Sequence, residues 1–437
     1  MNGAAHSVKN TAKNIALLVL VLLLAVLCGL NWLTGLSVSQ MPADSLLRRV
    51  YDHVSGGAVG YELRSSGIAA AEPIQLALTA DGTLSGVQYS LSEIDAGLEA
   101  VQPLWAEVLS GAGTLAEAEE SELLSALQNG DCALLRYDGA LPLSVIAGWM
   151  GGTWKSEQNA HTLLFSAHES RVYVRTGDGR LLAASAKADG GTLQKAKEGF
   201  RGFRCEFAGD GYAVYPETLL FARETLSLEL LTPEEIRLFD PQSDASVQTV
   251  LSAFGYTPYT QPFEEQGGKV EVFVDDISTL RLHEDGLVQY AALGDTGTVL
   301  AFDKGELSGH AALDAQLDCA RTVLDTAMRA VGAETRASLY AVRREGDTTT
   351  LVFAQAYGGV AILGETDFAT FVFREGVLST ASVNLQRFST GDTRRTVMPA
   401  LQAAAAASGN GKTGLTVAYL EQDGRYVPIR GFMEIHE

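Results

Sequence analysis

The longest apolar run in the chain lies near its start, at Ile15–Leu30, and apolar and small residues continue to Leu36. No charged residue occurs between Lys13 and Asp44. In helical conformation, about 20 such residues span the hydrocarbon core of a membrane. The pattern therefore predicts a single transmembrane helix over residues 15–36.

The charges beside this segment predict its orientation. Lys9 and Lys13 precede it, and the next cation is Arg48. Because cationic flanks stay in the cytoplasm, we expect residues 1–14 inside the cell membrane and the bulk of the chain outside. A cleaved signal peptide is the alternative. Its apolar region usually has only ~7–15 residues and a small-residue cleavage site, whereas this run is longer and has Trp32 as an interfacial anchor.

The outer half of the predicted helix carries small and polar residues at helical spacing. Since lipid gives helices no hydrophobic drive to associate, they associate through close packing of small residues and interhelical hydrogen bonds. We therefore expect one face to contact another membrane helix; the alternative left open is that these residues mark the fraying end of the helix. The contact residues are Ala25, Cys28, Gly29, Asn31, Trp32 and Gly35.

Beyond the membrane segment, alternating apolar residues flank acidic-Gly dipeptides, which is a strong signal for a hairpin turn. These dipeptides are Asp81-Gly82, Asp178-Gly179, Asp285-Gly286, Glu375-Gly376 and Asp423-Gly424. Helical spacing of apolar residues recurs between them. The clearest case is His310 to Val331, with Gly332 as its C-terminal cap.

Hairpins that alternate with isolated helices predict an α+β fold. We expect one N-terminal transmembrane helix followed by successive small antiparallel-sheet-plus-helix modules outside the cell. The expected divisions are an N-terminal extracellular α+β domain at 37–205, a central domain at 206–306 and a C-terminal α+β domain at 307–437.

Composition narrows the possible partners. Hydrophobic residues make up 46% of the chain, which supports a packed core. The net charge of −21 disfavours binding to nucleic acid. Cys132, Cys205 and Cys319 are an odd number outside the membrane segment and form no Cys-x-x-Cys motif, so we expect buried small apolar groups.

The sequence contains no complete catalytic motif, so we predict no enzymatic activity. Gly411-Lys412-Thr413 lacks the first glycine of a phosphate-binding loop, since Ala406 stands there. Asp295-Thr296-Gly297 has no second copy in the chain to complete an aspartic protease pair, which only a homodimer would supply. His161 and His168 are the only near pair of histidines, at a spacing more typical of surface or core residues than of zinc ligands. No catalytic residue, cofactor, metal site or small-molecule substrate is identified.

Two stretches carry a resemblance to a known family. The segments Phe254–Tyr259, Gly267–Val274 and Thr279–Leu282, followed by Asp285-Gly286, resemble the central part of YycH-type regulatory proteins. These are single-pass accessory proteins of Gram-positive bacteria.

The C-terminal third is similar to the related YycH/YycI module. There a long helix precedes a strand pair like Tyr340–Tyr357, a turn like Gly358-Gly359-Val360 and a helix start like Pro399–Ala403. The last strand departs from the family, which often has a Trp directly after the proline that corresponds to Pro428; here Ile429 follows.

This resemblance implies a non-enzymatic membrane regulatory protein. Its partner would be a cell-wall-related two-component histidine kinase of the WalK type, contacted through transmembrane and extracellular surfaces. A YycI-like protein would be a further partner. No catalytic residue carries over, because the family has none. The alternative is an extracellular membrane-anchored enzyme or ligand-binding module that acts on cell-wall components.

Overall fold

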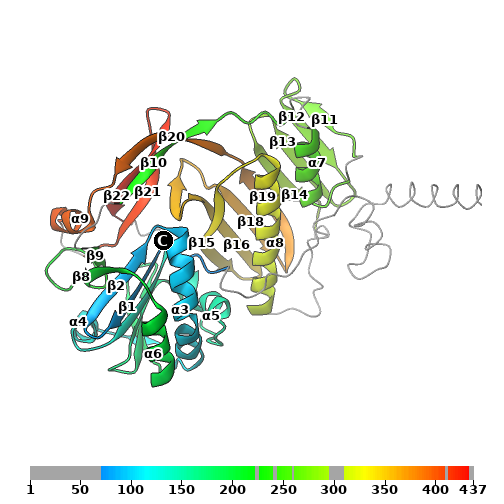
Figure 1. Ribbon diagram of the computed structural model, residues 1–437. Helices are drawn as coiled ribbons and strands as arrows, with labels where there is room; N and C mark the ends of the chain where they lie inside the picture. The colour runs from blue at the N-terminus through cyan, green and yellow to red at the C-terminus, as the bar shows by residue number, and fades with distance from the viewer. Residues whose placement is uncertain are drawn as a thin grey trace, which may run out of the picture.

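The computed structural model describes residues 70–221, 226–239, 244–257, 260–294, 310–408 and 412–432. They form a mixed α/β fold built on a large, mostly β framework of two sheets and a third group of strands (Figure 1). All three are connected by strand pairing, so the described residues form one continuous structure.

The first sheet is antiparallel and comes from the N-terminal part of the described chain. Its strands lie in the order β9–β8–β2–β1–β4–β5–β6–β7–β3. Their bounds are β1 Gln75–Ala80, β2 Thr83–Gln88, β3 Ala116–Glu117, β4 Cys132–Pro142, β5 Asn159–Ser166, β6 Arg171–Thr176, β7 Leu181–Ser185, β8 Phe203–Phe207 and β9 Leu219–Phe221.

Both faces of this sheet are covered, and its sequence shows why. Leu76 and Leu78 point to one core while Ala77 between them points to another, because successive side chains of a strand alternate between faces. The first face packs on three helices, α3 (Leu91–Ser110), α5 (Leu143–Met150) and α6 (Gly190–Gly199); the second packs on α4 (Glu120–Gln128).

The second sheet is also antiparallel, in the order β11–β12–β13–β14–β19–β18–β16–β15. Two helices, α7 (Asp244–Ala253) and α8 (His310–Ala330), pack on one face of it (Figure 1). The strands are β11 Phe263–Glu265, β12 Val270–Val274, β13 Ser278–His283, β14 Leu287–Ala292, β15 Arg336–Glu345, β16 Thr348–Tyr357, β18 Ala369–Arg374 and β19 Val377–Asn384.

A third group of strands branches from β16, whose last residues pair with β17. It continues in the order β17–β21–β22–β10–β20, with β17 and β21 parallel. The short helix α9 (Ala400–Ala406) packs between this group and β9. The strands are β10 Ser227–Glu234, β17 Val360–Leu363, β20 Arg387–Thr396, β21 Leu415–Gln422 and β22 Arg425–Phe432.

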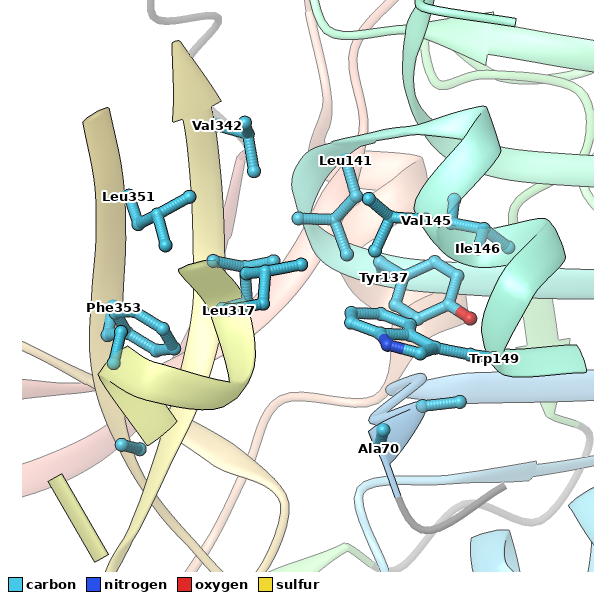
Figure 2. Close-up of a cluster of buried hydrophobic side chains, with 14 of the residues drawn as sticks. Ala70, Tyr137, Leu141, Val145, Ile146, Trp149, Leu317, Val342, Leu351 and Phe353 are labelled. Carbon is cyan, nitrogen blue, oxygen red and sulfur yellow. The ribbon is translucent and has the colours of Figure 1, made fainter. Parts of the chain in front are cut away.

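The two sheets meet where β4 runs beside β15. Ala140 pairs with Ala341 in parallel orientation, and Gly139 lies against the backbone of Tyr340. Around this contact the hydrophobic core is continuous (Figure 2). Side chains of β4 and α5 face those of α8, β15 and β16 across it: Tyr137, Leu141, Val145 and Trp149 on one side, Leu317, Val342, Leu351 and Phe353 on the other.

The predicted fold class is therefore wrong. The strands do not form successive small modules, because β14 pairs with β19, β10 with β20 and β22, and β17 with β21 across long stretches of sequence. Local alternation specifies each hairpin but carries no information about which hairpins pair with one another. The hairpins themselves are confirmed: each acidic-Gly turn joins two antiparallel strands, and Asp81, Glu375 and Asp423 have positive φ.

The helix expected over 310–331 is confirmed as α8, and Gly332 after it has φ +68°. The expected transmembrane helix over 15–36 lies outside the described residues. Among those that are described, no helix combines the length and apolarity needed to cross a membrane.

Candidate functional site

The candidate site is a cavity of about 460 Å³ between the first and second sheets. One wall is the N-terminal half of α3, with Leu91, Ile94 and Leu98. The others are the chain just before β1, the middle of β4 and the start of β15. The cavity therefore depends on how the two sheets dock and exists in neither alone.

Small side chains on neighbouring strands create the space. Ser338 of β15 pairs with Ala354 of β16, and Ala356 pairs with Ala361 of β17, so all four lie on adjoining strands. They line the cavity, whereas the alternating residues Leu339 and Phe353 belong to the core. A row of larger residues at these positions would fill the volume.

The turn between β16 and β17 closes one end of the cavity. Gly358 and Gly359 both have positive φ, at +61° and +90°. A Cβ on Gly359 would lie 3.5 Å from the Leu91 side chain at the start of α3. The two glycines therefore make a turn that α3 can approach closely.

The lining of the cavity is acidic. Five carboxyl side chains line it, together with a single guanidinium, that of Arg336. Asp95 and Glu99 are exposed at its edge and lie one turn apart on α3, so they share a face of the helix. The remaining carboxyl groups are partly buried and come from three different elements: Glu72, Asp138 and Asp325.

Glu72 lies just before β1, and its carboxyl group faces the cavity. Burial raises its pKa, while the Arg321 charge and a hydrogen bond from Ser338 act in the opposite direction. Its Oε2 atom is buried and has no hydrogen-bond partner among the described residues. A positively charged group in the cavity would supply that missing partner.

Asp138 lies at the irregular stretch of β4, where the pairing with β5 shifts register between Arg136 and Leu141. Burial raises its pKa as well, against a hydrogen bond from Thr416 and the nearby Arg136 charge. Thr416 Oγ1 donates to Asp138 Oδ1 at 3.0 Å. Asp138 thus faces the cavity and also helps to hold β21 against the first sheet.

A second cluster of buried charges lies on the other face of the first sheet. Arg175 is 2% exposed; its Nε donates to Glu217 Oε1 at 2.9 Å and its Nη2 donates to Glu217 Oε2 at 3.0 Å. It also donates to Glu120 at the start of α4 and lies 4.3 Å from the ring centroid of Tyr215. Because every part of this guanidinium already has a protein partner, the cluster serves to hold the segment before β9 over the sheet.

His161 and the three cysteines among the described residues occupy structural positions. His161 is buried beside this cluster, and burial together with the Arg136 and Arg175 charges lowers its pKa to about 3. Burial raises the pKa of the Cys132 and Cys205 thiols to about 12. Cys319 is also buried, and its pKa is raised by the same cause. The expectation that these three cysteines are buried is confirmed.

The sequence-predicted contact residues belong to the N-terminal segment that the structure does not describe. Ala25, Cys28, Gly29, Asn31, Trp32 and Gly35 all lie outside the described residues. Asp295 also lies outside them, whereas Lys412 binds Asp210 at 2.8 Å on the surface. Within the described ranges, no group of three or more His, Cys, Asp or Glu side chains is arranged to hold a metal ion.

Sequence reasoning missed the cavity. Its carboxyl groups lie between residues 72 and 325, on elements whose docking no local pattern predicts. The spacing of Asp95 and Glu99, which puts both on one face if the segment is helical, was the available signal, and such pairs are common on solvated surfaces.

Comparison with known protein families, with characterised proteins and with solved structures gives no match.

Proposed function

We propose that this protein is a non-enzymatic regulatory protein of the cell membrane that modulates a cell-wall-related histidine kinase of the WalK type. The observation that carries the proposal is the resemblance of residues 245–437 to YycH-type and YycI-type proteins. Membrane and extracellular contacts, with a YycI-like protein as a further partner, belong to the same proposal.

The pKa values of one buried histidine and two buried thiols make these groups unsuited to acid–base or nucleophilic catalysis. A general acid or base works best with a pKa near the operating pH, and a nucleophilic thiol needs a lowered pKa. His161 has a pKa far below that range, and the Cys132 and Cys205 thiols have pKa values far above it. These groups are suited to packing, and the absence of enzymatic activity stays part of the proposal.

The test is to delete the gene and to restore it, while transcription of the genes under the kinase's control is measured. We expect deletion to change that transcription and the wild-type chain to restore it. Lys412→Ala, which removes only an exposed ion pair, should restore it equally well. Unchanged transcription on deletion, together with failure of the kinase to co-purify with the chain, would show that the proposal is wrong.

The acidic cavity favours a second candidate, a ligand-binding module. This candidate is compatible with regulation, because a regulator that senses a small molecule needs such a site.

A further inference from the structure

We propose that the cavity between the two sheets binds an organic cation, namely a primary ammonium group carried on an apolar body. This inference rests on the proposed regulatory function only for its biological role; the binding itself is argued from the cavity. Two sources of this chemistry are possible, a free amine or the lysine side chain of a peptide.

The size and lining of the cavity suit a small molecule. Its volume of about 460 Å³ falls within the ~300–1,000 Å³ typical of ligand pockets. Apolar side chains of α3 and a row of alanines provide contact area, and polar groups converge from three sides. A few polar groups fixed in an apolar surround are what orient a ligand in such sites.

The charge of the lining selects a cation. Five carboxyl groups line the cavity with one guanidinium, so an anion would meet net repulsion and a neutral molecule without a donor would leave the buried Glu72 Oε2 without a partner. Asp95 and Glu99 at the edge would attract the cation, and Glu72 inside would pair with it. Ammonium offers three hydrogen-bond donors, which matches carboxylate oxygens that converge from different elements.

Binding should also release protons. Burial raises the pKa of both Glu72 and Asp138, since no fixed cation balances their charge fully. A bound ammonium group would favour the ionised carboxylates over the protonated acids. Calorimetry in two buffers of different ionisation enthalpy measures this release, which a merely apolar ligand would not cause.

The experiment is isothermal titration calorimetry of the purified full-length chain. The probes are cadaverine, as a free amine, and the tripeptide Ala-Lys-Ala, as a lysine side chain; the same peptide with an acetylated lysine is the neutral control. We expect saturable binding of at least one cationic probe and none of the acetylated peptide. Preference for cadaverine or for the peptide identifies the source.

Matched variants locate the binding. Glu72→Gln and Glu99→Gln remove a cavity charge and preserve shape, and each should weaken binding about tenfold. Glu93→Gln removes an exposed charge from the same helix, outside the cavity, and should leave affinity within about twofold. Ala356→Leu should abolish binding by filling the space, and an unchanged circular dichroism spectrum would show that it folds.

Failure of both cationic probes to bind would overturn the inference. So would equal weakening by Glu93→Gln and Glu99→Gln, or wild-type affinity in a folded Ala356→Leu. A chain that alters kinase-dependent transcription but binds no cation would retain its proposed function without this ligand. A chain that binds the cation but has no effect on the kinase would show the reverse.

Discussion

The substitution Gly139→Ala tests how the two sheets dock, because it adds one methyl group where β4 lies against the backbone of β15. A Cβ built on Gly139 would lie 1.7 Å from the Tyr340 carbonyl oxygen and 2.5 Å from its carbonyl carbon. An ordinary carbon–oxygen contact is about 3.3 Å, so Gly139→Ala requires β4 and β15 to separate by about 1.6 Å.

The expected cost follows from what must move. Overpacking a core typically costs ~1–3 kcal/mol, with relief from side-chain rearrangement. Here the obstacle is backbone, which has no alternative rotamer, and the separation would also disturb the core shown in Figure 2. We therefore expect the free energy of unfolding to fall by about 3 kcal/mol or more.

The assay is denaturation by guanidinium chloride, followed by circular dichroism. Gly148→Ala is the matched control, because it lies in α5 near the same interface and a Cβ there meets nothing within 4 Å. Alanine is favoured over glycine in a helix by ~0.5–1 kcal/mol, so this variant should be slightly stabilised. If Gly139→Ala loses less than about 0.5 kcal/mol relative to wild type, the reasoning about the β4–β15 contact is refuted.

Three further outcomes are expected. Arg175→Ala should lower the free energy of unfolding by about 3–5 kcal/mol, because it leaves Glu217 buried without its partner. Arg180→Ala, which removes an exposed ion pair, should lower it by less than about 1 kcal/mol. Equally small losses in both variants would contradict the structural role of the buried cluster. His161 has a folded-state pKa of about 3, below its unfolded value, so its contribution to stability is present above about pH 6.5 and is lost as pH falls toward 3. Relative to His161→Gln, the wild-type chain should lose up to ~1.4 kcal/mol per pH unit in that window, and a flat difference would contradict the assigned burial. Iodoacetamide at pH 8 should leave Cys132, Cys205 and Cys319 unmodified until denaturant is added, and peptide mapping measures this. Rapid labelling of any of these thiols in the native chain would be inconsistent with their burial and raised pKa values.

Sequence patterns predicted the local elements well, for physical reasons that act over a few residues. The five acidic-Gly turns need positive φ at the glycine or its neighbour, and the apolar stripe of α8 follows the helical repeat. Asp138-Gly139 has the same dipeptide and shows the limit of this reasoning. It lies within β4, where the glycine is needed because another strand's backbone approaches closely.

The arrangement of the sheets could not be predicted in this way. The parallel contacts of β4 with β15 and of β17 with β21 join residues about 200 and 60 positions apart, and their stability comes from packing across the interface. The cavity follows from that packing. Ser338, Ala354 and Ala356 read as ordinary strand residues until the structure places α3 over them.

The central claim is that the chain acts by binding to and modulating a histidine kinase. Its most direct test is the autophosphorylation rate of a WalK-type kinase in lipid vesicles, measured with and without the purified full-length chain. The claim predicts a change of about fivefold or more, as expected for a typical coupling free energy, and no change with an unrelated membrane protein. An autophosphorylation rate that stays the same at saturating amounts of the chain would contradict it.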